Sequence, residues 1–178
     1  LREGITLRHF RHSHNHDHGH DHKHTNDEEG IVDPHAWLDP MLLKKQAETI
    51  TEALCQADPA HRDMYRKRFQ TIQERLHGLH SELQKILKPV RGKKMFVFHP
   101  AFGYFADAYG LQQRSIEIEG KKPGPRELNR IIRNARKHDV TTLFVQKQFS
   151  TRGARAVARA LNGEVEVLDP LSADYINN

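Results

Sequence analysis

The chain has 178 residues, which is enough for one domain with a hydrophobic core, or for one domain and part of another. Hydrophobic residues make up 37% and charged residues 29% of it, a globular composition, and no apolar run approaches the ~20 residues that a membrane-spanning helix needs. The net charge of +5 is spread along predicted helices among acidic residues, so we expect a solvated surface and no nucleic-acid partner.

The first thirty residues combine a short strand-like run with a histidine-rich stretch. The chain opens with neither an initiator methionine nor an apolar signal segment, so we expect it to start inside a longer protein. Residues 4–7 have the pattern of a short strand. Eight histidines then follow within sixteen residues: His9, His12, His14, His16, His18, His20, His22 and His24. Because this stretch cannot form a core, we predict a disordered loop over residues 9–24.

Two helices are predicted next. Asp39 followed by Pro40 is a good helix start, with a carboxylate N-cap and a proline at the first helical position, and the helix extends to about residue 57. Cys55 is the single cysteine, which excludes an internal disulfide and a cysteine-based zinc finger. After a break at Asp58, a helix of about 28 residues carries one apolar stripe. The stripe consists of Tyr65, Phe69, Ile72, Leu76, Leu79, Leu83 and Ile86.

The pattern changes after residue 89 to strands that alternate with helices. Strands are predicted at 95–98, 114–118, 142–145 and 165–168, and helices at about 101–109, 125–138 and 151–162. Such alternation indicates βαβ units. The predicted fold class is therefore α/β, with a parallel sheet flanked by helices and preceded by a long helix.

Polar residues follow three of these strands, namely His99, Gln146 and Asp169. Because the carboxyl ends of parallel strands meet at one edge, these side chains are expected on the same edge of the sheet. An imidazole and a carboxylate suit zinc. Taken singly, a histidine at a strand end is more often a hydrogen-bonded core residue, and an aspartate before proline is usually a turn residue.

The histidine-rich stretch favours the metal hypothesis, because so many imidazoles have little structural use and bind Zn²⁺, Cu²⁺ or Ni²⁺. A purification tag is the alternative. Tags, however, are usually uninterrupted and terminal, whereas this run alternates with aspartate, asparagine and glycine.

Five motifs resemble those of the metal-binding solute receptors of ABC transporters, which capture zinc or manganese. Residues 33–40, Asp-Pro-His-Ala-Trp-Leu-Asp-Pro, resemble the family's D-P-H-x-W-L-x-P motif. Residues 97–105 resemble its second-lobe metal motif, residues 123–128 its P-S-P-x-x-L segment, residues 144–150 its F-x-E-x-Q-F-S segment, and residues 167–171 its closing ligand strand. The resemblance covers nearly all of residues 31–178, and the histidine-rich loop before the first motif is typical of the zinc branch.

The resemblance implies two α/β lobes joined by a long helix, with one metal ion between them. It assigns residues 1–30 to the end of a first lobe plus the loop, 31–88 to the metal-motif segment and linker helices, and 89–178 to the C-terminal lobe. It makes His35, His99 and Asp169 metal ligands, with one more histidine expected from the first lobe. His99 stands where manganese receptors usually carry glutamate, which favours zinc over manganese. The loop histidines would be weak auxiliary sites.

The expected function is high-affinity zinc capture in the periplasm, or on a lipid anchor outside the cell membrane, and delivery to the membrane permease of an ABC transporter. No catalysis is expected. One alternative is a zinc-dependent hydrolase, or an enzyme in which His99 is a general base oriented by Asp169. Another is a metal-storage or metallochaperone module that works through the loop alone. Deleting residues 9–24 separates these readings, because a receptor keeps one tight site.

Overall fold

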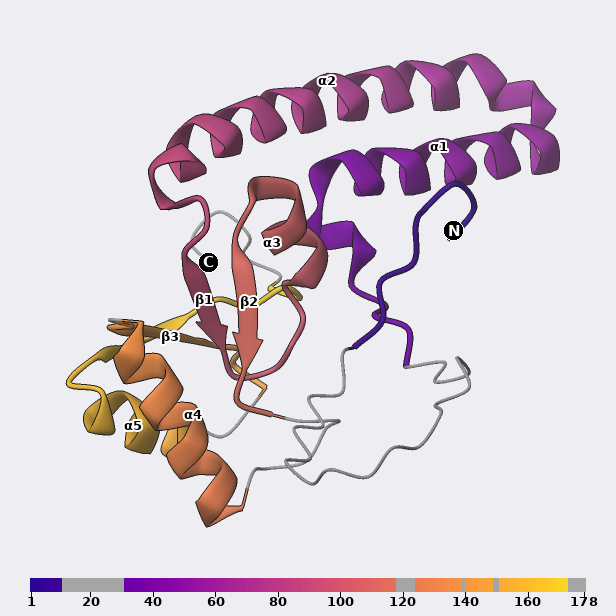
Figure 1. The fold of residues 1–178 in the computed structure, drawn as a ribbon. Coiled ribbons are helices and arrows are strands. Elements are labelled where there is room, and N and C mark those ends of the chain that lie inside the picture. Colours follow the sequence, from indigo (N-terminus) through magenta and orange to yellow (C-terminus); the bar gives the residue numbers. More distant parts are fainter. Residues whose placement is uncertain (11–30, 118–123, 139, 149–150, 173–178) are drawn as a thin grey trace, which may run out of the picture.

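A computed structural model describes residues 1–10, 31–117, 124–138, 140–148 and 151–172 (Figure 1). The described part consists of a pair of long helices and an α/β lobe. In the part of the chain that is described, no helix combines the length and apolarity that crossing a bilayer requires.

The first long helix begins where the sequence predicted, and the second begins about two residues later than expected. A 3-10 turn at Ala36–Leu38 leads into α1, Pro40–Ala57, where the Asp39 carboxylate caps the helix by accepting a hydrogen bond from the Met41 amide at 2.8 Å. A second 3-10 turn, Pro59–His61, reverses the chain into α2, Arg62–Leu87. The two helices pack along each other at one end of the molecule (Figure 1). A last 3-10 turn, Lys88–Val90, leads to the lobe.

The predicted parallel sheet is confirmed. Its strands are β1 (Lys94–Val97), β2 (Gln112–Ser115), β3 (Thr142–Val145) and β4 (Glu164–Val167). They lie in the order β2-β1-β3-β4, and all three pairings are parallel. The connecting helices are α3 (Gly103–Tyr109), α4 (Pro125–Lys137) and α5 (Thr151–Ala160).

Both faces of the sheet are covered. On one face, Phe96, Phe98, Leu143 and Val145 pack with Ala135 of α4 and with Ala154 and Val157 of α5. On the other face, Met95 and Val97 pack with Phe102 and Phe105, and Phe144 and Leu38 join them. Leu38 belongs to the 3-10 turn just after His35, so this second cluster attaches the first motif to the lobe.

Two local expectations were wrong. Residues 4–7 do not form a strand; Ile5 is buried against Ala36 and Tyr104 instead, and an isolated antiparallel bridge joins His9 to Val32. The second strand lies at 112–115 rather than 114–118. Pairing starts at Gln112 opposite Lys94, two residues after the left-handed Gly110 that ends α3. The apolar Ile116, expected at the centre of the strand, lies just beyond its end.

Candidate metal centre

The strand register brings polar side chains level with one another at the carboxyl edge of the sheet. Val97 of β1 pairs with Ser115 of β2 and with Phe144 of β3. The strands themselves end at Val97, Ser115 and Val145; continued two residues past Val97, this register would set His99 between Glu117 and Gln146. Asp169 lies two residues beyond β4, on the far side of β3. His99 and Asp169 therefore follow strands that end at the same edge, with one strand between them.

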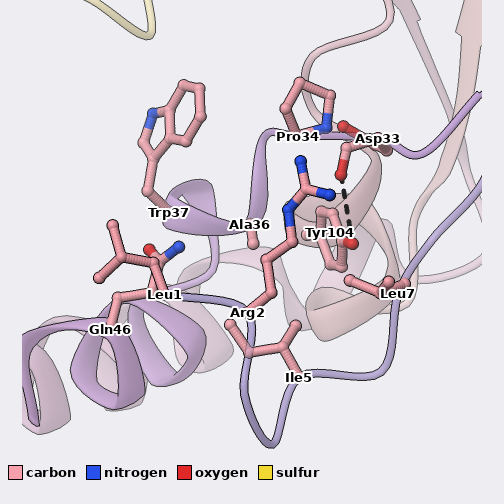
Figure 2. A pocket seen from close by; sticks show the side chains of 10 residues that line it. All are labelled: Leu1, Arg2, Ile5, Leu7, Asp33, Pro34, Ala36, Trp37, Gln46 and Tyr104. Atoms are coloured by element: carbon pink, nitrogen blue, oxygen red, sulfur yellow. Dashed lines mark hydrogen bonds between the residues drawn. The ribbon is translucent and has the colours of Figure 1, made fainter. Parts of the chain in front are cut away.

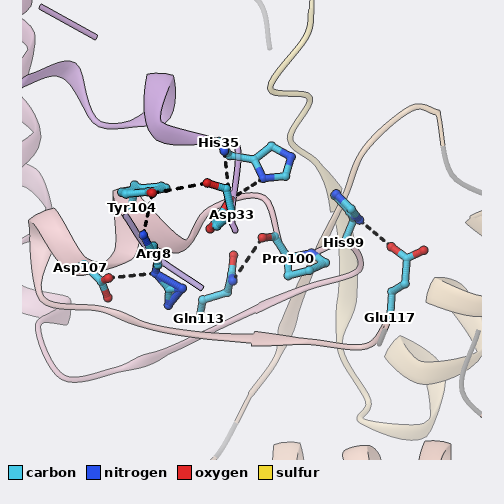
Figure 3. A network of polar contacts seen from close by, with 9 residues as sticks. All are labelled: Arg8, Asp33, His35, His99, Pro100, Tyr104, Asp107, Gln113 and Glu117. Carbon is cyan, nitrogen blue, oxygen red and sulfur yellow. Dashed lines mark hydrogen bonds and ion pairs between the residues drawn. The ribbon is translucent and has the colours of Figure 1, made fainter. Parts of the chain in front are cut away.

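His99 is anchored by a carboxylate that lies two residues beyond the neighbouring strand β2. Its Nδ1 lies 2.6 Å from Oε2 of Glu117 (Figure 3). Glu117 is only 6% exposed, and its backbone amide donates to the Phe98 carbonyl at 2.9 Å. The carboxylate is thus fixed by the sheet itself, and it restricts how the imidazole can rotate.

His35 is anchored in the same way by a carboxylate from its own motif. Its Nδ1 lies 2.7 Å from Oδ1 of Asp33, and its backbone amide donates to the same oxygen at 3.0 Å. Asp33 is 1% exposed. The Tyr104 hydroxyl donates to the Asp33 carbonyl at 3.4 Å and accepts from the Arg8 amide at 2.8 Å (Figure 3). The segment before the histidine-rich stretch therefore braces the first motif.

The two imidazoles lie together although they come from distant parts of the sequence. Their ring centroids are 5.4 Å apart, with an interplanar angle of 77°. When each neutral ring carries its proton on Nδ1, that proton is donated to the carboxylate and Nε2 presents a lone pair. This arrangement is the usual one for histidines that bind metals, because the carboxylate fixes both the tautomer and the ring orientation.

Asp169 is placed differently. It is 5% exposed, and both of its carboxylate oxygens accept from Nε2 of Gln148, at 2.8 and 3.0 Å. The Leu171 amide donates to one of them at 3.1 Å. Within the described residues, no three histidine, cysteine, aspartate or glutamate side chains are grouped closely enough to hold a metal ion. The structure therefore brings His35 and His99 together, and the inclusion of Asp169 as a third ligand stays a prediction.

The predicted auxiliary histidines are almost all outside the described part of the chain. His9 is exposed and lies in the bridge to Val32, so it belongs to a paired segment rather than to a loop. The other seven fall outside the described residues: His12, His14, His16, His18, His20, His22 and His24.

A separate cavity of about 230 Å³ lies beside the first motif (Figure 2). Ile5, Leu7, Pro34 and Trp37 contribute to its largely apolar lining, and among the described residues Asp33 alone supplies a carboxylate. No imidazole of the described residues lines it, so it is a weaker candidate for a metal centre than the histidine pair.

Sequence reasoning missed two residues of this site, Glu117 and the anchoring role of Asp33. Asp33 could have been noticed, because it stands two positions before His35 and its side chain can reach back to its own loop. Nothing in the sequence pairs Glu117 with His99, since that contact depends on the register of β1 against β2.

The parallel lobe and the long helix before it match one lobe of a solute-binding protein. A solved structure described as ZnuA superimposes with a TM-score of 0.84 at 37% identity, over 98% of this chain and 62% of that one. A zinc-bound ZnuA deletion mutant gives 0.77 at 42% identity, over 83% of this chain and 57% of that one.

Comparisons of the sequence point to the same family as the solved structures. The model of the family described as "Zinc-uptake complex component A periplasmic" matches residues 1–178. The high-affinity zinc uptake system protein ZnuA of Brucella abortus is 33% identical over 147 residues, which are 82% of this chain and 44% of that protein. Its namesake in Bacillus subtilis is 30% identical, over 79% of this chain and 44% of that protein. The chain belongs to this ZnuA family, and it spans about half the length of the curated relatives it matches.

Proposed function

We propose that this chain is the metal-binding C-terminal portion of an extracytoplasmic receptor that captures zinc and delivers it to the permease of an ABC transporter. One observation carries the proposal: the rings of His35 and His99, from two separate motifs, have centroids 5.4 Å apart, and each is anchored through Nδ1 by a buried carboxylate. The zinc-uptake relatives named above support the same assignment.

Zinc is the cargo that suits these residues best. Imidazole nitrogen and a carboxylate oxygen, from His35, His99 and Asp169, form a donor set that zinc accepts readily in tetrahedral sites. Manganese is harder and prefers oxygen donors. Replacing His99 by glutamate should therefore shift preference toward manganese, and competition between the two ions for the His99→Glu variant measures that shift.

A receptor needs a site that binds and releases an ion without chemical change. We therefore expect no catalysis from His99 and Asp169, in contrast to a zinc hydrolase, which keeps an open metal position for water. The storage alternative places all binding in the histidine-rich stretch. Deleting that stretch separates these alternatives: a receptor keeps its tight zinc site, whereas a storage module loses nearly all of its zinc binding.

The decisive experiment compares His99→Ala with deletion of residues 9–24 in the full-length protein, by zinc titration against a competing chelator. His99→Ala should weaken the tightest binding constant more than the deletion does. A ligand held at a strand end loses little conformational entropy when the metal arrives, whereas a loop must order many residues at ~1–2 kcal/mol each. Asp169→Ala should also weaken binding, by a smaller factor, because water can occupy the vacated position.

His77→Ala is the matched control, because His77 is an exposed histidine on α2. It should leave zinc binding unchanged. An unchanged tightest binding constant in His99→Ala would rule out the strand-end site, and the receptor assignment of this chain with it. Loss of nearly all binding on deletion of residues 9–24 would favour the storage module.

A further inference from the structure

Gln146 is a buried side chain whose polar atoms have no partners. It follows β3 directly and is 2% exposed, yet neither its amide oxygen nor its amide nitrogen makes a hydrogen bond. Two other described residues, Asp33 and Gln113, each have one unpartnered buried atom, but both make another hydrogen bond through the same side chain. Buried amides are nearly always hydrogen-bonded in native proteins, so Gln146 requires an explanation.

The strand register sets Gln146 beside the candidate metal ligand. Val97, the last residue of β1, pairs with Phe144 on the neighbouring strand ~4.8 Å away; continued two residues past the end of β1, this register sets His99 level with Gln146. Val145 pairs with Val167, which sets Gln146 within one residue of the level of Asp169 on its other side. Gln146 thus stands between the two strand-end residues that are expected to bind the ion.

Gln146 also belongs to the face of the sheet that the first motif covers. Side chains alternate along a strand, and Phe144 and Val97 both pack in the cluster that Leu38 joins. Gln146 lies two residues beyond Phe144 and directly follows β3, so it continues this face. His99 follows Val97 through a bend at residues 98–100, and its ring centroid lies 5.4 Å from that of His35, whose motif packs on this face through Leu38.

We propose that Gln146 is a positioning residue of the zinc site, whose amide hydrogen-bonds a group in the coordination shell of the bound ion. That group is the Asp169 carboxylate or a zinc-bound water. The inference rests on the proposed function, because it assumes that His99 and Asp169 bind zinc. It accounts for the unpartnered amide, which is satisfied when the cargo is present. Carboxylates that bind metals are themselves hydrogen-bonded by outer residues, and loss of such a partner commonly weakens affinity by ~10- to ~100-fold.

The neutral amide also influences which ion the site prefers. A carboxylate at this position would add a second negative charge beside Asp169 and a further oxygen donor. Both changes favour harder ions such as manganese. Gln146→Glu should therefore raise manganese affinity relative to zinc, in the same direction as His99→Glu.

The test is Gln146→Leu in the full-length protein, because leucine has a similar size and removes both unpartnered atoms. Without zinc, the melting temperature should stay the same or rise, since an unsatisfied buried amide is gone. Zinc affinity should fall about 10-fold. These opposite effects on stability and binding are not expected of a purely structural residue. Gln112→Leu, at the exposed start of β2, is the matched control and should leave zinc affinity unchanged.

A second measurement uses the wild-type protein, so it does not depend on how well a variant folds. The side-chain amide resonances of Gln146 in the ¹⁵N-labelled wild-type protein should shift when zinc is added. A double-mutant cycle with Asp169→Ala identifies the bonded group: coupled losses indicate the carboxylate, and additive losses indicate a zinc-bound water.

The outcomes separate the two proposals. If His99→Ala abolishes tight binding while Gln146→Leu keeps wild-type affinity, or if the wild-type amide resonances do not respond to zinc, the role of Gln146 is overturned and the receptor function stands. If His99→Ala retains tight binding, the receptor function itself fails.

Discussion

Each imidazole of the histidine pair depends on a carboxylate that does not itself need to touch the ion. For His99 this is Glu117, buried and 2.6 Å from Nδ1. Glu117→Gln retains the size of the side chain but removes its charge, and the amide can either accept from Nδ1 or donate to it. The tautomer that presents Nε2 is then no longer enforced. We expect zinc affinity to fall about 10-fold, measured by chelator competition, with little change in the melting temperature of the metal-free protein.

Glu166→Gln provides the control for Glu117→Gln, because Glu166 is an exposed glutamate on β4. It should bind zinc like the wild type. If Glu117→Gln and the wild type bind zinc with equal affinity, the Glu117 carboxylate has only a structural role and does not support zinc binding by His99.

Sequence reasoning selected candidate residues whose signal is local and missed those whose signal is tertiary. His99, Gln146 and Asp169 were candidates because each follows a predicted strand, and parallel strands end at one edge. Glu117 fell inside the strand that was predicted two residues too late. Its role depends on its being level with His99, and no single-sequence pattern encodes that register.

At the scale of elements, the turn between α1 and α2 is held by a small polar network. The Asp58 carboxylate accepts from the Tyr65 hydroxyl at 2.9 Å and lies 2.8 Å from Nδ1 of His61. The Tyr65 hydrogen bond, followed by the His61 contact, lowers the pKa of Asp58 below its usual 3.8. A carboxyl group whose pKa is lower in the folded state contributes stability above its unfolded pKa, and this contribution is lost as pH falls through the folded pKa.

Asp58→Asn should therefore destabilise the protein at pH 5, and the difference from the wild type should shrink as the pH falls below 3.8. Denaturant unfolding of both proteins between pH 5 and pH 2.5 measures it. Because the turn is solvent-exposed, the effect should be small and sensitive to salt. A constant difference across this range would mean that ionisation of Asp58 does not stabilise the turn.

A second contact joins the long helix to the lobe. The Tyr109 hydroxyl of α3 lies 3.2 Å from Nδ1 of His80 on α2, and Tyr109 is buried. Burial, together with the negative charge of Asp39, raises the pKa of Tyr109 to about 12. Since the folded state retains this proton more strongly than the unfolded state, stability should fall as pH rises from ~10, the unfolded value, towards 12.

Tyr109→Phe should reduce this alkaline loss, because phenylalanine has no proton to release. At neutral pH the variant should be less stable by about 1 kcal/mol, the typical net worth of one hydrogen bond. Unfolding curves at pH 8, 10 and 11 measure both effects. If the two proteins lose stability in parallel above pH 10, the Tyr109 hydroxyl is not the group responsible.

Periodicity predicted the type of each major element, but not which residues of its apolar face are buried. Both long helices and all four strands were expected, and the helix that starts at Pro40 was placed to the residue. The apolar stripe of α2 was predicted as one surface. In the structure Leu76 is buried, whereas Ile72, Leu79 and Ile86 are 44%, 45% and 62% exposed. A hydrophobic period shows that a face is apolar; which neighbour covers it depends on tertiary packing.

At the scale of the whole molecule, the histidine pair links the first motif to the C-terminal lobe. His35 precedes the long helices and His99 follows them, and the first motif attaches to the lobe chiefly through Leu38, Ala36 and Tyr104. An ion bound by both histidines would close this junction. Because the unfolded chain cannot hold the two imidazoles at 5.4 Å, binding must favour the folded state.

Zinc should therefore raise the melting temperature of the full-length protein, by an amount that grows with the logarithm of free zinc. At a free concentration 100-fold above Kd, the expected stabilisation is about 2.7 kcal/mol. Differential scanning calorimetry across a series of buffered zinc concentrations measures it, and a chelator should reverse it. His99→Ala should remove most of the increase, whereas deletion of residues 9–24 should preserve it, because the deletion leaves both His35 and His99 in place. Equal stabilisation of His99→Ala and wild type by zinc would place the stabilising ion elsewhere in the protein.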